Sequence, residues 1–134
     1  MVSKLPINEL SSRVIGAAIE VHRALGPGLL ESAYEACLCR ELTLQDLPFV
    51  SQRHLPVEYK GVHLDCGYRI DVLVDERLIV ELKAVDTITN LHKTQLMTYL
   101  RLMDCELGLL INFNVPVLVN GVSRVSMGAP NLEA

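Results

Sequence analysis

Residues 68–84 read YRIDVLVDERLIVELKA, with two short apolar runs on either side of the polar triplet Asp75-Glu76-Arg77. Short runs rich in Val, Ile and Leu that end at polar residues are typical of β-strands. Asp71 and Glu81 interrupt these runs, and a carboxylate in an apolar strand is costly unless it has a partner or binds a metal ion. The stretch therefore predicts an antiparallel hairpin that contains two acids.

The length of the connecting loop decides whether these acids can act together. A two-residue turn at Asp75-Glu76 places Asp71 opposite Val80 and turns Glu81 to the other face of the sheet. A loop of all three residues pairs Asp71 directly with Glu81, with their Cβ atoms about 5 Å apart. Lys83 then shares the face of Glu81, because side chains alternate along a strand. Both registers are open at this point.

The second register would bring together two carboxylates and an ammonium, which is the set that metal-dependent phosphodiester hydrolysis requires. Asp71 and Glu81 can hold Mg²⁺ or Mn²⁺, which neutralises phosphoryl charge and makes bound water a better nucleophile. Lys83 can orient that water or stabilise the transition state. The alternative is a salt-bridged pair of strands with Glu81 and Lys83 on a solvated face.

A helix is expected next, capped by Thr87 or Thr89 and reaching to about residue 103. Its core face is Leu96, Leu100 and Met103. His92, Gln95 and Tyr99 form a polar stripe beside that face. If the stripe faces the carboxylates, Gln95 can hold a phosphate or water and Tyr99 can position a backbone oxygen. The alternative is an ordinary exposed helix edge.

The remaining elements follow from apolar periodicity and turn residues. Helices are expected at 8–25 and about 29–44, joined by Gly26-Pro27-Gly28 and packed as a hairpin. Strands are expected at 54–59, 68–74 and 78–85, as an antiparallel meander, and at 106–113 and 117–125. The order helix, helix, three strands, helix, two strands predicts an α/β fold. We expect one domain over residues 1–134, with an ordered core at about 8–125 and a loose tail at 127–134.

Composition limits the class of protein. The 134 residues include 16 acidic and 12 basic side chains, a net charge of −4, so binding to free nucleic acid through bulk charge should be weak. The most apolar stretch, 107–119, is too short and too polar to cross a membrane, and the first residues lack the features of a secretory signal. We therefore expect a cytoplasmic protein. The same stretch could form a homo-oligomer interface or core strands.

Cysteine and histidine are the other residue types that could supply metal ligands. The four cysteines, Cys37, Cys39, Cys66 and Cys105, lack zinc-ligand spacing and are expected to be reduced thiols. His22 and His92 could join the carboxylates as ligands, although lone histidines beside apolar positions are usually structural.

One further motif is the segment Gly28-Leu29-Leu30-Glu31-Ser32-Ala33-Tyr34. It is accompanied by the segments Glu20-Val21-His22, Leu25-Gly26-Pro27 and Leu109-Leu110-Ile111-Asn112-Phe113. From about Asn8 to Val125 the chain resembles the GxxExxY proteins, within the PD-(D/E)XK nuclease superfamily. The resemblance implies a restriction-endonuclease-like core, in which helices flank a mixed sheet. It departs from the nominal pattern at Ile70, where proline is usual.

The resemblance also implies roles for particular residues. Asp71, Glu81 and Lys83 occupy the metal-site positions, and Gln95 and Tyr99 match a Gln-x-x-x-Tyr feature of some nucleases. Glu31 is a candidate additional acid, or simply an acid well placed at a helix N-terminus; Tyr34 would pack beside it or in the core. The expected function is a metal-dependent nuclease acting on nucleic acid, chiefly DNA. The alternative is a catalytically inactive binding or assembly module with the same fold.

Overall fold

A five-stranded mixed sheet forms the middle layer of the protein, which we describe from a computed structural model over residues 5–127. The helices are α1 (Ile7–Leu25), α2 (Glu31–Leu44), α3 (Asn90–Met103) and the short 3-10 helix η1 (Leu118–Gly121). The strands are β1 (Phe49–His54), β2 (Val57–Tyr59), β3 (Val62–Leu64), β4 (Arg69–Val74), β5 (Leu78–Lys83), β6 (Leu107–Asn112) and β7 (Val122–Ser126).

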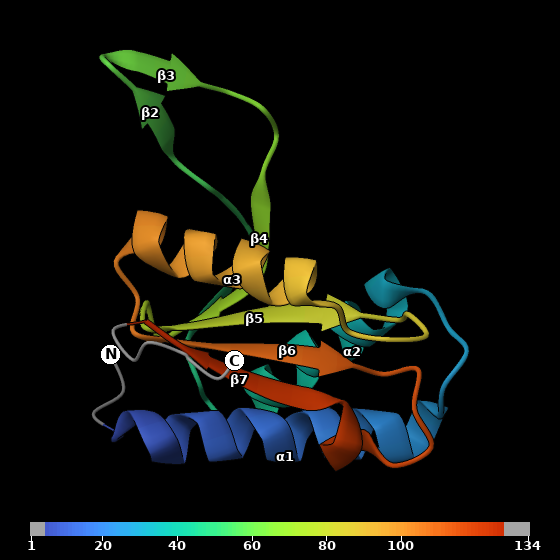
Figure 1. The fold of residues 1–134 in the computed structure, drawn as a ribbon. Helices are drawn as coiled ribbons and strands as arrows, with labels where there is room; N and C mark the ends of the chain where they lie inside the picture. Colours follow the sequence, from blue (N-terminus) through green and yellow to red (C-terminus); the bar gives the residue numbers. More distant parts are fainter. Residues whose placement is uncertain (1–4, 128–134) are drawn as a thin grey trace.

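The sheet has the order β1-β4-β5-β6-β7, in which β5 and β6 are parallel and the other neighbours are antiparallel. Helices α1 and α2 cover one face and α3 covers the other (Figure 1). This arrangement confirms the expected α/β class with a mixed sheet between helices. No helix within residues 5–127 is long and apolar enough to cross a bilayer.

Alternation along the strands builds two separate cores. Val72, Val80 and Leu82 face α1 and α2, whereas Leu73 and Ile79 face α3. Burial of these branched side chains on both faces contributes the main favourable term in folding. Helix α3 approaches β6 so closely that a Cβ on Gly108 would lie 2.8 Å from Leu96 Cδ1, so only glycine fits at Gly108 without a shift of Leu96.

Several expected boundaries were wrong. The predicted strand at 54–59 is divided: β1 ends at His54, and β2 pairs with β3, which was not predicted. Proline lacks the N–H of a strand ladder, so Pro56 separates β1 from β2. Lys60 and Gly61 have φ of 48° and 85°, a tight turn that closes the β2–β3 hairpin. The segment 117–125 forms η1 and then β7 rather than one strand.

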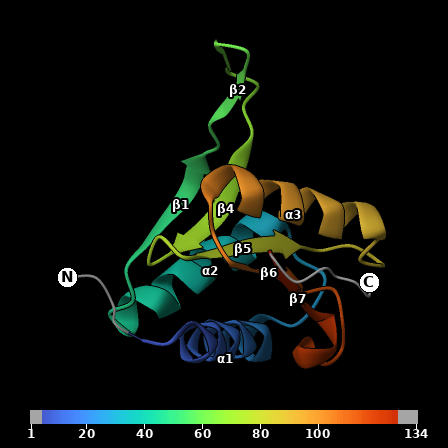
Figure 2. The same cartoon turned by 60° about the vertical axis from the view of Figure 1, so that its left-hand side comes forward.

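Residues 55–68 form an arm that extends away from the sheet, with β2 and β3 at its outer end (Figures 1 and 2). Both strands of the arm are short, and β3 is exposed along its whole length. The arm leaves from β1 and returns into β4, the strand that contains Asp71. It therefore lies directly beside the predicted site.

The apolar stretch from Leu107 divides between core and surface. Strand β6 is buried at every position between β5 and β7, so residues 107–112 are core and not an interface between copies. Val117 and Val119 are exposed. The tail expected to be loose begins at Met127, whose N–H donates to Glu106 O (3.0 Å); the rest of it, 128–134, lies outside the described residues.

Candidate active site

A three-residue loop connects β4 to β5. Val74 pairs with Leu78, and the N–H of Arg77 donates to Val74 O (3.0 Å). Asp75 and Glu76 have φ of 55° and 56°, in the left-handed region. The register that places Asp71 and Glu81 across from each other is thus confirmed, and the two-residue alternative is wrong.

The two acids replace backbone hydrogen bonds where the strands separate. Regular pairing runs to Val72 and Val80 and stops before Asp71. There the N–H of Asp71 donates to Glu81 Oε2 (2.9 Å), and the N–H of Leu82 donates to Asp71 Oδ2 (2.8 Å). Each carboxylate is therefore fixed by the backbone of the opposite strand.

Burial and mutual repulsion shape the electrostatics of this pair. Glu81 is 6% exposed. Burial, and then the charge of Asp71, raise its pKa to about 8. Burial also raises the pKa of Asp71, against the lowering effects of the Leu82 N–H and the Lys83 ammonium. Two neighbouring carboxylates that both disfavour ionisation are typical of a site that holds either a shared proton or a cation.

The donor set fits a small divalent cation. Carboxylate oxygens are the ligands that Mg²⁺ and Mn²⁺ prefer, and Mg²⁺ commonly takes one or two carboxylates, completing its shell with water and substrate phosphates. Across residues 5–127 no group of three or more His, Cys, Asp or Glu side chains is placed to hold an ion. The geometry therefore suits an open two-carboxylate site at Asp71 and Glu81, and not a closed protein cage.

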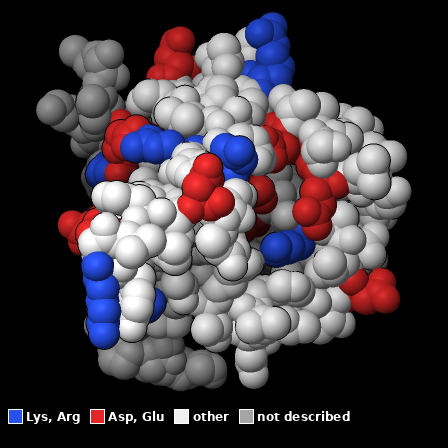
Figure 3. Space-filling model, turned by 90° about the horizontal axis from the view of Figure 1, so that it is seen from above, with Lys and Arg blue, Asp and Glu red and all other residues white. Residues whose placement is uncertain are grey.

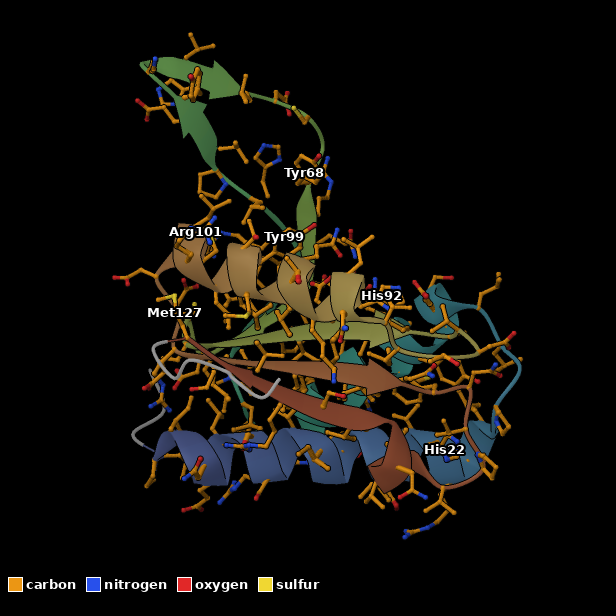
Figure 4. The ribbon with its side chains drawn as sticks, in the orientation of Figure 1. His22, Tyr68, His92, Tyr99, Arg101 and Met127 are labelled. Carbon is orange, nitrogen blue, oxygen red and sulfur yellow. The ribbon has the colours of Figure 1, made fainter. Side chains whose placement is uncertain are left out.

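The histidine hypothesis was wrong. His22 Nε2 lies 2.8 Å from Val115 O, on α1 and across the sheet from α3 (Figure 4). His92 lies in the first turn of α3, where its Nδ1 accepts from the N–H of Thr89 (3.0 Å) and its own N–H donates to Thr89 Oγ1 (3.2 Å). Thr89 is therefore the helix cap, and both histidines have structural partners.

Lys83 is the last residue of β5, and the chain is fixed on both sides of it. Its carbonyl accepts from the N–H of Phe113 (2.9 Å). The next N–H, of Ala84, donates to Glu31 Oε2 (3.0 Å). The buried side chain of Asn112 binds both the N–H and the carbonyl of Val85 (3.1 and 2.9 Å). Lys83 is thus held at a defined position two residues beyond Glu81.

Glu31 is the first residue of α2, where a carboxylate also suits the helix dipole. Its charge raises the pKa of Asp71, so it belongs to the same electrostatic environment. Tyr34 is fully buried: its hydroxyl donates to Gly26 O (2.6 Å) and accepts from the N–H of Leu29 (3.1 Å). Its ring stacks on Phe113 with centroids 4.3 Å apart. Tyr34 is therefore a core residue that fixes the turn in front of Glu31.

The polar stripe of α3 lies beside Lys83. Gln95, Tyr99, His92 and Lys83 all line one cavity of about 650 Å³, which we call the α3 cavity. Gln95 is exposed, whereas Tyr99 is buried apart from its edge on the cavity. Burial, and next the charge of Glu81, raise the pKa of the Tyr99 hydroxyl. The helix thus places Tyr99 within electrostatic reach of the two acids.

Two residues that the sequence did not single out join this site. Gln52 Nε2 donates to both carboxylate oxygens of Glu35 (2.9 and 3.1 Å), and its hydrogen bond to Asp71 lowers the pKa of that acid. Gln52 has a φ of 54° and lies where the β1–β4 pairing is interrupted, opposite Asp71. Glu35 follows Glu31 by one helical turn. That spacing could have revealed Glu35, but no local pattern pointed to Gln52.

Acidic and basic side chains are mixed on the face that carries the arm and α3, where the described residues form no continuous basic surface (Figure 3). Two basic groups nearby are already paired: Arg53 with Glu76 (3.2 Å) and His54 with Asp65 (3.5 Å). A face with mixed charges should bind free nucleic acid only weakly, which agrees with the expectation from the net charge of the chain.

A family model described as the PD-(D/E)XK nuclease superfamily matches residues 8–125. No curated protein and no solved structure matches the chain. The matched range begins in α1 and ends in β7, and includes every residue of the site described above. The three-layer architecture is consistent with a restriction-endonuclease-like fold.

Proposed function

Because the chain belongs to the PD-(D/E)XK nuclease superfamily, we propose that it is a divalent-metal-dependent nuclease whose substrate is DNA. Membership of the superfamily implies that the substrate is a nucleic acid, and its nucleases usually use a divalent ion as cofactor. Mg²⁺ or Mn²⁺ is our choice of ion, because the site offers carboxylate oxygens and no thiolate. We further propose that residues 8–125 form one catalytic domain.

One observation supports this function above the others: the reciprocal bonds between the hairpin strands and the two acids. The N–H of Asp71 binds Glu81, and the N–H of Leu82 binds Asp71. A salt-bridged pair of strands would not need a buried Glu81 beside a half-buried Asp71. Burial raises the pKa of both acids, and the charge of Asp71 raises that of Glu81 further, so holding both acids ionised has a cost. A cation shared by Asp71 and Glu81 offsets that cost.

The proposed roles follow from position. Asp71 and Glu81 would hold the ion, which when bound supplies positive charge at the phosphoryl oxygens and lowers the pKa of water. Lys83 orients the attacking water or stabilises charge in the transition state. Gln95 holds a phosphate oxygen or water from the α3 side, and Tyr99 positions a backbone oxygen with its hydroxyl. Glu31 acts on Lys83 indirectly, as a positioning residue, through its bond to Ala84.

Metal removal gives the first test. Purified protein is expected to cleave DNA when Mg²⁺ or Mn²⁺ is present and to lose cleavage in excess EDTA, because the two carboxylates alone cannot neutralise a phosphodiester. Single- and double-stranded DNA and RNA are compared by gel electrophoresis of end-labelled substrates. Cleavage that persists in EDTA, or that is absent with every ion and substrate, would contradict the proposal.

A second function is a catalytically inactive binding or assembly module with the same fold. The mixed charge of the arm face and the net charge of −4 favour it, since many nucleases present a basic surface to their substrate. Folded protein that binds no Mn²⁺ through Asp71 or Glu81 would support this module over the enzyme.

We also propose membership of the GxxExxY group within the superfamily. Each signature position has a definite place in the fold: Gly28 takes a φ of 102°, Glu31 binds Ala84, and Tyr34 fixes the preceding turn. All four cysteines are free thiols, which suits a reducing compartment, and we propose the cytoplasm.

A further inference from the structure

The α3 cavity lies between α3 and the base of the arm. Lys83, Gln95 and Tyr99 of the proposed catalytic site line it, whereas the proposed metal ligands Asp71 and Glu81 do not. Its volume of about 650 Å³ is within the range of small-ligand sites. We propose that this cavity receives an unpaired nucleobase of the substrate strand, adjacent to the phosphodiester that is cleaved. This inference rests on the proposed nuclease function and specifies its substrate as a strand with unpaired bases.

The walls have the chemistry of a base-binding site. Leu55 and Val57 from the arm and Leu91 and Leu102 from α3 make most of the surface apolar. Tyr68, at the arm end of β4, lies above Tyr99 of α3 (Figure 4). Proteins that hold single-stranded nucleic acid stack bases on such aromatic rings, whatever the base.

Polar groups converge on the same space. Gln95, Thr94 and Thr98 line the cavity from one side of α3, and amides and hydroxyls can both donate to and accept from the edge of a base. Tyr68 is 49% exposed, which is a large exposure for an aromatic side chain that lines a cavity. A half-exposed aromatic ring in the wall of a cavity is accessible for stacking against a bound ligand.

Continuity with the carboxylates favours a nucleotide over other ligands. Lys83 lines the cavity, and its positive charge partly offsets the effect of burial on the pKa of Asp71 and of Glu81, so Lys83 neighbours both the cavity and the acids. Tyr99 also lines the cavity, and after burial the charges of Glu81 and Asp71 are among the causes that raise the pKa of its hydroxyl. A ligand that fills the cavity and also reaches the metal site must combine a flat, largely apolar group with a phosphate, as a nucleotide does. An apolar peptide has no phosphate to place beside Lys83 and a metal ion.

The consequence is a preference among substrates. A base that is paired and stacked in a duplex cannot enter a side cavity unless it is first extruded, and single strands or frayed ends avoid that cost. Single-stranded DNA and unpaired flaps should therefore bind more tightly than a blunt duplex of the same sequence.

The test uses a short single-stranded oligonucleotide that contains 2-aminopurine, in EDTA so that no cleavage occurs. Tyr68→Ala is compared with Tyr59→Ala, which removes an equal ring from the outer part of the same arm; Tyr59 is 62% exposed and does not line the cavity. Neither tyrosine belongs to the two cores, so both variants should keep the wild-type circular dichroism spectrum.

We expect the 2-aminopurine fluorescence of the wild-type complex to be quenched by stacking. Tyr68→Ala should weaken binding about 5- to 100-fold and remove the quenching, while Tyr59→Ala should match wild type. Equal affinity and quenching in Tyr68→Ala and Tyr59→Ala would overturn the base-site proposal, as would duplex binding as tight as single-strand binding.

The base site and the nuclease function can fail independently of each other. Metal-dependent cleavage without any effect of Tyr68→Ala on binding would leave the nuclease intact and remove the base site. Binding of single strands that depends on Tyr68, with no cleavage under any ion, would support the base site and remove the enzyme.

Discussion

Lys83→Ala is expected to lower the rate of DNA cleavage by about 10²- to 10³-fold, the loss typical of removing one charged or hydrogen-bonding group that acts on the transition state. The backbone that carries Lys83 is fixed at the end of β5 by the bonds that Glu31 and Asn112 make to the next two residues. Alanine keeps those backbone bonds, so the fold and the two carboxylates should remain. Initial rates at saturating Mn²⁺ measure the effect.

Lys93→Ala is the matched control. Lys93 is an exposed residue of α3 that does not line the α3 cavity, and its loss changes the net charge by the same amount. This variant should cleave at the wild-type rate. If Lys83→Ala cleaved as fast as Lys93→Ala, Lys83 would have no part in the chemistry.

The ion-free protein is expected to lose stability as pH rises from about 5 to about 8. Glu81 has a folded-state pKa of about 8, against 4.5 as its ordinary value. Between these values the folded protein holds a proton that the unfolded chain has released, so the free energy of unfolding falls as pH increases. The pKa of Asp71 is raised as well, and its contribution has the same sign.

Glu81→Gln should remove most of this dependence. The amide keeps a carbonyl oxygen that can accept from the N–H of Asp71, and it has no charge to bury. Without a divalent ion, the variant should resemble wild type near pH 5 and exceed its stability by about 2–4 kcal/mol near pH 9. Urea unfolding at several pH values, followed by circular dichroism, gives the two curves.

The exposed acid Glu58 supplies the comparison, because Glu58→Gln removes an equal charge from the arm. Its stability curve should run parallel to that of wild type. Parallel curves for Glu81→Gln as well would mean that Glu81 is not destabilised by burial beside Asp71, contrary to the electrostatics of the site.

The hairpin and its acids could be predicted because their evidence is local. Asp71 and Glu81 interrupt apolar runs, and alternation alone places Lys83 on the face of Glu81. The loop length could not be decided, because Asp75 and Glu76 adopt left-handed backbone without the glycine that usually signals it. The cap at Thr89 was also predictable, since a threonine before a helical pattern is a local feature.

The residues that support the site depend on contacts between distant positions. Asn112 binds Val85, 27 residues away, and Gln52 binds Glu35, 17 residues away. A polar residue at the end of an apolar strand is visible in a sequence, but its partner is not. The strands of the arm were not predicted for a related reason. They contribute little to either core, so residues 55–68 show only a weak alternation of apolar and polar side chains.

We propose that Asp71 and Glu81 together hold one divalent ion. Titration of the protein with Mn²⁺ near pH 8 by isothermal calorimetry measures this binding, with Asp71→Asn, Glu81→Gln and the exposed control Glu58→Gln measured alongside wild type. We predict one site in wild type and in Glu58→Gln, with proton release because the ion displaces a proton from the pair, and loss of that site in both site variants. Wild-type binding in either site variant, or no binding in wild type, would contradict the account.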